Sequence, residues 1–142
     1  MALLSEALAA TGPRVIGATG GSGTRVTARI VRDAGMFIGS ELNAYEDALT
    51  FGEFSDTWIN KYVAGGEAGR DALTGAMVED FQARLERHLA TRPESAVAWG
   101  WKEPRSIYLL PFLNEQMPTF RVLPFIPGGR DMAFPDNQKP PE

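Results

Sequence analysis

Apolar and polar residues alternate along the chain in blocks that predict a strand, a helix and another strand. Residues 14–17 form a short apolar run before a glycine-rich turn, which predicts a buried strand. Beyond the turn, Val26, Ile30 and Ala34 recur every four residues. That is the spacing of a helix face, and the glycine that follows is placed to end the helix. The apolar residues 36–39 predict a second strand or extended segment.

The middle of the chain has a less regular pattern. Residues 40–71 are polar and aromatic without a clean period, which predicts a mixture of loops and short helices. Apolar residues then recur every four positions over residues 77–89, so we expect a helix over about residues 75–90. His88 falls near the end of that helix between charged and apolar neighbours, and we expect it on the surface.

The last third of the chain repeats the alternation of strand and helix. Residues 96–101 have the composition of a strand, and Ser106 is placed to cap a helix running through Leu113. Residues 120–126 also resemble a strand, but Pro124 lies near their centre. Because proline donates no ladder hydrogen bond, it argues against a central strand there. This order of elements predicts an α/β fold with a largely parallel sheet.

Composition narrows the class of protein. The chain has 142 residues, of which 44% are hydrophobic and 23% charged, the balance of one globular domain. Its net charge of −4 argues against nucleic acid as a partner. The absence of cysteine and the single histidine exclude disulfides, a cysteine nucleophile and a histidine-rich metal site, so no metal is expected.

The sequence shows neither a membrane-spanning segment nor a signal peptide. No apolar run approaches the roughly 20 residues that span a bilayer, and the first ten residues lack the basic region of a signal peptide. We therefore expect a cytoplasmic protein without a membrane partner.

The link between the first strand and the first helix has the features of an anion site. Free backbone N–H groups and the positive end of a helix converge there, and glycines let the backbone approach a ligand closely. Three glycines in four residues are more than a plain turn needs. Arg25 adds a positive charge at the mouth of this cradle. The cradle consists of Gly20, Gly21, Ser22, Gly23 and Thr24.

Two common nucleotide motifs are excluded at this turn. The loop of nucleoside triphosphatases needs lysine before its serine or threonine, where this chain has Gly23. The dinucleotide fingerprint G-x-G-x-x-G is absent in every register of the turn. The anion is therefore not assigned by either motif.

Three segments of the chain resemble the sulfotransferase family. Residues 21–26 look like its loop for the 5′-phosphosulfate of 3′-phosphoadenosine 5′-phosphosulfate (PAPS), and residues 14–39 look like the unit around that loop. Residues 100–113 resemble its Lys-x-Pro segment and the helix that follows. Residues 129–134 resemble its 3′-phosphate motif, in which Arg130 remains.

The resemblance implies a domain plan. We expect a lead-in at 1–13, a sulfotransferase-like cofactor-binding domain at 14–135, and a disordered tail at 136–142. The implied fold is a three-layer, P-loop-like α/β fold with a mostly parallel sheet. The chain looks truncated relative to the family, with the C-terminal part of the fold missing, and exposed apolar surface would then favour self-association.

The resemblance also implies roles for individual residues. The chain would transfer a sulfuryl group from PAPS, without a metal, to a hydroxyl or amine of a small-molecule or glycan acceptor. The cradle, Arg25 and Arg130 would bind the cofactor. Because the lysine of the family's loop is replaced here by Gly21, Lys102 or Arg25 would stabilise the leaving phosphate. The candidates for the general base, among which the sequence does not choose, are Glu41, Glu46 and Asp47.

Several family positions are altered, which leaves the activity open. Pro127 and Gly128 stand where the family has a phosphate-binding arginine and its aspartate, and Pro135 stands where it has serine. Proline replaces neither a guanidinium nor a hydroxyl donor. One alternative is therefore a catalytically inactive fragment that acts as an anion-binding module. A less favoured alternative is a P-loop kinase of small molecules. The acceptor cannot be assigned, because aromatic residues such as Trp99 and Trp101 are more often core than pocket lining.

Overall fold

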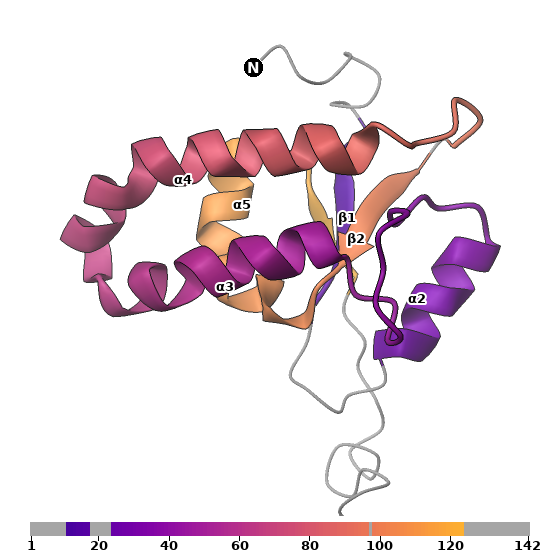
Figure 1. The fold of residues 1–142 in the computed structure, drawn as a ribbon, viewed down its shortest axis with the longest axis horizontal. Coiled ribbons are helices and arrows are strands. Elements are labelled where there is room, and N and C mark those ends of the chain that lie inside the picture. The colour runs from indigo at the N-terminus through magenta and orange to yellow at the C-terminus, as the bar shows by residue number, and fades with distance from the viewer. Residues whose placement is uncertain (1–10, 18–23, 97, 124–142) are drawn as a thin grey trace, which may run out of the picture.

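The protein is an α/β fold built on a parallel sheet, which confirms the predicted class (Figure 1). The computed structural model describes residues 11–17, 24–96 and 98–123. The described sheet has the order β2-β1-β3. Strand β1 (Pro13–Ile16) therefore lies between β2 (Trp99–Lys102) and β3 (Arg121–Val122), and both pairs are parallel. The predicted lead-in before residue 11 and the tail at 136–142 lie outside the described residues.

The strand predicted at residues 36–39 is reduced to a single bridge. Phe37 pairs in parallel with Trp99, on the edge of β2 away from β1. The Phe37 amide donates to the Ala98 carbonyl at 3.0 Å, and the Gly100 amide donates to the Phe37 carbonyl at 2.9 Å. Gly39 then adopts a φ of 111°, which turns the chain away before a longer ladder can form.

The helices lie on both sides of the sheet (Figure 1). Helix α2 covers one face, whereas the α3–α4 hairpin and α5 pack against the other. Their bounds, with that of the 3₁₀ helix η1, are α2 Thr24–Asp33, α3 Leu49–Ala64, α4 Gly66–Leu89, η1 Pro104–Leu109 and α5 Leu110–Gln116.

Residues 40–71 are more regular than the prediction of loops and short helices, which was wrong for most of them. Helix α3 occupies 16 residues, and α4 begins at Gly66, ahead of the predicted start near residue 75. Phe51, Phe54 and Tyr62 are buried in α3 at spacings of three and eight residues, which place them on one helix face. The pattern was missed because serine, threonine and glycine interrupt this aromatic stripe.

The larger core lies between the sheet and the α3–α4 hairpin. Val15 of β1 and the two tryptophans of β2, Trp99 and Trp101, face this side and are buried with residues of α3, α4 and α5. Phe51 stacks on Trp101 with ring centroids 4.0 Å apart. Phe81 meets Trp101 edge to face. These tryptophans therefore pack in the core, which is the use that the sequence favoured for them.

Helix α2 confirms the predicted helix but turns a different face to the sheet. Ala28 is fully buried in the smaller core, beside Ile16 and Ile38. Val26 and Ile30 are instead 58% and 63% exposed. The four-residue spacing identified the helix correctly, but it did not identify the buried face.

His88 is buried, so its predicted surface position was wrong. Its ring packs against Phe37, Phe51 and Trp101, and Nε2 lies 2.7 Å from the Gly100 carbonyl oxygen. His88 lies in the last turn of α4 next to β2, and its side chain points into the core. Burial lowers the pKa of His88 from its usual value, although the bond to Gly100 acts in the opposite direction.

The helix expected after residue 101 begins differently from the prediction. Ser106 does not cap it, because Pro104 starts the 3₁₀ turn η1 and Ser106 lies inside that turn. The Ser106 hydroxyl instead accepts a hydrogen bond from Trp101 Nε1 at 3.3 Å. Proline suits the first position of a helical turn because its fixed φ matches and no N–H is needed there. Helix α5 follows directly at Leu110.

Strand β3 lies at one edge of the described sheet and pairs with β1 alone among the described strands. Its described part is two residues long. The central proline of the predicted strand, Pro124, lies outside the described residues. In the parts of the chain that the structure describes, no helix combines the length and apolar content needed to cross a bilayer.

Candidate functional site

The carboxyl ends of β1 and β2 lie side by side. Ile16 is in register with Lys102, and the Glu103 amide donates to the Ile16 carbonyl at 3.1 Å. Gly17 then passes close to η1: a Cβ added there would meet Ile107 Cγ2 at 3.0 Å. The chain leaves β1 at this point for the predicted cradle.

Part of the predicted cofactor site lies outside the described residues. Gly20, Gly21, Ser22 and Gly23 belong to this part, as does Arg130, and their roles stay predictions. Thr24 is the first residue of α2. The described chain therefore ends β1 at the carboxyl edge of the sheet and resumes with a helix start, and the glycine-rich residues link the two.

Lys102 is the buried cation of this edge. Its side chain is only 3% exposed, unlike the solvated lysine that often flanks a strand. Its Nζ donates to Asp47 Oδ1 at 2.5 Å and to the Tyr45 carbonyl at 2.7 Å. An ammonium group so far from water needs such acceptors. Lys102 and Asp47, both predicted as site residues, are thus a directly bonded pair.

A tight turn before α3 carries the two groups that bind Lys102. The Asn43 side-chain oxygen accepts the amides of Tyr45 at 2.8 Å and Asp47 at 3.0 Å. Between them, Glu46 has a φ of 68°, a left-handed conformation that costs energy for a residue with a Cβ. The turn therefore holds the Tyr45 carbonyl and the Asp47 carboxylate toward the end of β2.

The same turn contacts the first helix. The Arg25 guanidinium lies over the Tyr45 ring, 5.7 Å from its centroid, within the range of a cation–π contact. Glu46 forms ion pairs with Arg29, at 3.8 Å, and with Arg32. Three predicted site residues, Arg25, Asp47 and Lys102, are therefore brought together around Tyr45. Glu46, the second base candidate, is turned toward α2.

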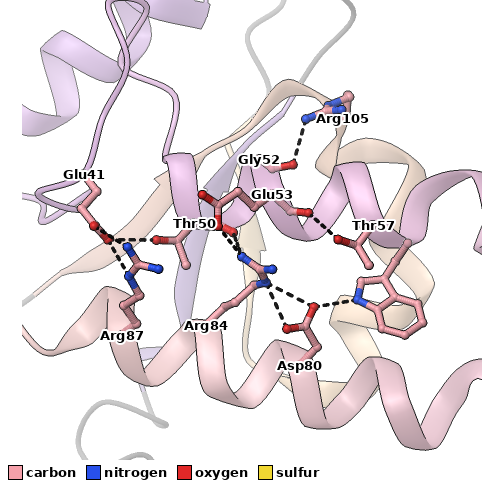
Figure 2. A network of polar contacts seen from close by, with 10 residues as sticks. Glu41, Thr50, Gly52, Glu53, Thr57, Asp80, Arg84, Arg87 and Arg105 are labelled. Atoms are coloured by element: carbon pink, nitrogen blue, oxygen red, sulfur yellow. Dashed lines mark hydrogen bonds and ion pairs between the residues drawn. The ribbon is translucent and has the colours of Figure 1, made fainter.

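Glu41 lies away from this cluster, against the α3–α4 hairpin (Figure 2). It accepts two hydrogen bonds from Arg87, at 3.0 and 2.7 Å, and one from Thr50 at 3.2 Å. The hydrogen bond from Arg87 is the main cause that lowers the pKa of Glu41. Glu41 is thus a weaker base than an ordinary glutamate.

Figure 2 also shows how the hairpin itself is held. Arg84 of α4 donates to Glu53 at 2.8 Å and to the Thr50 carbonyl at 3.2 Å, both on α3. It also donates to Asp80, which accepts Trp58 Nε1 at 2.7 Å. These contacts fix α3, and with it the wall of the site described next.

Sequence reasoning missed a buried carboxylate, Glu103, beside Lys102. Glu103 is 4% exposed. Its Oε1 accepts from Arg105 Nε at 2.9 Å, and its Oε2 accepts from the Ser55 hydroxyl at 3.2 Å. Burial raises the pKa of Glu103, although Arg105 and Ser55 act in the opposite direction. The sequence feature that could have identified Glu103 is its position in Lys-Glu-Pro, directly after a predicted strand.

Glu103 opens onto a cleft of about 220 Å³. Arg105 forms its other side. It donates to Asp56 at 2.6 Å and to the Gly52 carbonyl at 3.1 Å (Figure 2). The polar residues that line the cleft are Asn43, Asp47, Glu53, Asp56, Glu103 and Arg105. The cleft therefore extends from Asp47, the partner of Lys102, to the start of η1.

Among residues 11–17, 24–96 and 98–123, no three histidine, aspartate or glutamate side chains are grouped so that they could hold a metal ion.

Comparisons of the chain with protein-family models, with curated proteins and with solved structures found no match.

Proposed function

We propose that this protein binds PAPS at the carboxyl edge of its sheet and transfers the sulfuryl group to a hydroxyl acceptor. The observation that carries the proposal is the cluster of Arg25, Tyr45, Asp47 and Lys102 beside the exit of β1. The proposal also rests on the resemblance of the glycine-rich link and the Lys-Glu-Pro segment to sulfotransferase motifs.

The position of the cluster supports ligand binding. In open α/β sheets, ligands bind outside the carboxyl ends of strands where neighbouring connections diverge. Here β1 has β2 on one side and β3 on the other, so the chain beyond Gly17 leaves at such a point. A helix start following a glycine-rich link offers N–H groups to an anion, and Arg25 in the first turn adds charge.

The same groups suit sulfuryl transfer. The reaction displaces the 5′-phosphate of the donor in line, so the protein acts mainly by positioning and by stabilising charge. Arg25 is exposed on α2 and is available to the donor. Lys102 contributes positive charge from beneath the site, where Asp47 and the Tyr45 carbonyl fix its position.

One observation favours a second candidate, an anion-binding module without catalysis. The Lys102 ammonium already has two acceptors, at 2.5 and 2.7 Å, so it has limited capacity to bond a leaving phosphate. In this candidate the protein binds the nucleotide but does not cleave PAPS.

Calorimetry with 3′-phosphoadenosine 5′-phosphate against ATP tests the proposed binding. We expect heat of binding with the former and little with ATP. Arg25→Ala should weaken the affinity about tenfold, the loss of roughly one charge-assisted contact. Arg29→Ala, one turn further along α2, removes the same charge and serves as the control. The proposal would be contradicted if Arg25→Ala and Arg29→Ala bound 3′-phosphoadenosine 5′-phosphate with equal affinity, or if the wild type bound neither nucleotide.

A further inference from the structure

We propose that Glu103 is the general base of this reaction and that the acceptor hydroxyl binds in the cleft beside it. The inference deepens the proposed function and rests on it. None of the base candidates named from the sequence is Glu103. Asp47 lines the same cleft, but the ion pairs of the three candidates distinguish Glu103 from them.

Glu103 has the position that a base requires. It follows Lys102 directly at the carboxyl end of β2, and its amide is bonded to the end of β1. Its carboxylate is held by Arg105 and Ser55, while the residue still lines the cleft. A base fixed in this way, next to an open volume, is placed to meet an entering hydroxyl group.

The other carboxylates are less suited to the role. Glu41 bonds Arg87 on the hairpin, and Glu46 is paired with two arginines of α2. Asp47 is the counter-ion of the buried Lys102, so protonating it would leave an ammonium without its compensating charge. Glu103 shares its arginine with Asp56, and the raised pKa of Glu103 brings it nearer to the range useful for a base.

The cleft also indicates the class of acceptor. Its volume of about 220 Å³ equals roughly seven waters at about 30 Å³ each, which is room for one small hydroxyl-bearing group. Its carboxylates outnumber their cationic partners by one. The carboxylates are Asp47, Glu53, Asp56 and Glu103, and the partners are Lys102, Arg84 and Arg105. We infer that the acceptor is a neutral or cationic hydroxyl compound, not an anionic one.

The step balances without a further reactant. The Glu103 carboxylate takes the proton of the acceptor hydroxyl, and the oxygen of that hydroxyl forms the new bond to sulfur. The bond between sulfur and the 5′-phosphate oxygen breaks, and its electron pair leaves on 3′-phosphoadenosine 5′-phosphate. The proton on Glu103 then passes to solvent.

The test measures sulfuryl transfer from PAPS by the full chain and by Glu103→Gln, which keeps the shape of the side chain. The acceptors are glucose, glucosamine and glucuronate, with tyrosol, tyramine and 4-hydroxyphenylacetate as a second set. We expect the variant to lose at least 100-fold in kcat while its affinity for 3′-phosphoadenosine 5′-phosphate is unchanged. The control is Glu86→Gln, which changes an exposed glutamate of α4. Anionic acceptors should have at least tenfold lower kcat/KM than their neutral or cationic partners.

Ser55→Ala gives a second readout, which is needed if Glu103→Gln does not fold. The Ser55 hydrogen bond lowers the pKa of Glu103, so its removal should move the acidic limb of the kcat profile to higher pH. The charged groups around Glu103 are Arg105 from η1, Asp56 and Glu53 from α3, and Asp47 from the preceding turn, which bonds Lys102. They remain in both proteins, so the comparison isolates the hydroxyl.

The outcomes separate the two proposals. Transfer by the wild type with an unchanged rate in Glu103→Gln, or an unmoved profile in Ser55→Ala, overturns the role of Glu103 and leaves sulfuryl transfer standing. Preference for the anionic acceptors overturns the assigned acceptor class. Nucleotide binding without transfer to any acceptor overturns sulfuryl transfer itself, and the role of Glu103 with it.

Discussion

Two buried ionisable residues give this protein opposite responses to pH. Burial is the main cause in both, because it disfavours the charged form. It lowers the pKa of His88 and raises that of Glu103. His88 therefore contributes its full stability above about pH 6.5, and this is lost as the pH falls toward its folded pKa. Glu103 contributes stability below about pH 4.5, which is lost as the pH rises through its folded pKa.

Comparing the wild type with His88→Gln isolates the first effect. We expect the wild-type free energy of unfolding to fall below pH 6.5 by up to about 1.4 kcal/mol per pH unit more than that of the variant. The measurement is urea unfolding at pH 7.0 and 5.5. The effect of Glu103 is present in both proteins and cancels in the difference. Equal losses in the two proteins would show that His88 is not held neutral by burial.

Some residues named from the sequence lie together in the structure, and another residue of the candidate site was missed for a physical reason. Arg25, Asp47 and Lys102 were named from motif and charge, and they lie together around Tyr45. Glu103 was missed because sequence does not show burial: a glutamate before proline reads as a solvated turn residue. Its burial depends on Ser55 of α3, 48 residues away in sequence.

At the scale of elements, local signals predicted β1, β2, α2 and most of α4, and tertiary contacts decided the rest. Residues 14–17, followed by a glycine-rich turn, correctly indicated β1. Helix α3 was missed because its buried stripe is interrupted by small and polar residues, one of which, Ser55, bonds Glu103. The shortening of the segment predicted at residues 36–39 to a single bridge could not be predicted, since it depends on where Gly39 turns beside His88.

The close pairing of β1 and β2 makes Gly100 the sharpest test of the sheet. A Cβ at Gly100 would lie 1.8 Å from the Arg14 carbonyl oxygen, a severe overlap with a backbone that cannot move without breaking the ladder. We expect Gly100→Ala to cost about 3 kcal/mol or more. Gly75, inside α4, has nothing within 4 Å of an added Cβ. Gly75→Ala should stabilise the protein by about 0.5–1 kcal/mol.

Urea unfolding of both variants, followed by tryptophan fluorescence, checks this contrast. The two substitutions add the same methyl group, so the difference between them reports the local environment alone. A mild effect of Gly100→Ala would contradict the register in which Gly100 opposes Arg14.

At the scale of the whole molecule, the parallel sheet brings distant parts of the chain to one edge. The first turn of α2, the turn at residues 43–47 and the end of β2 converge there, although nearly 80 residues separate Arg25 from Lys102. The core of α3, α4 and α5 supports the cleft from the other side. The proposed donor and acceptor sites thus lie next to each other at the carboxyl edge of the sheet, with Lys102 and Glu103 between them.

Backbone amide NMR during titration with 3′-phosphoadenosine 5′-phosphate tests whether the carboxyl edge of the sheet binds the nucleotide. We expect the largest shift changes at the amides of Gly20 to Arg25, with smaller changes around Lys102. Amides of the α3–α4 turn, such as Gly65, should not move. Saturable shifts confined to other parts of the chain, or none at millimolar nucleotide, would contradict the claim that this edge of the sheet is a nucleotide site.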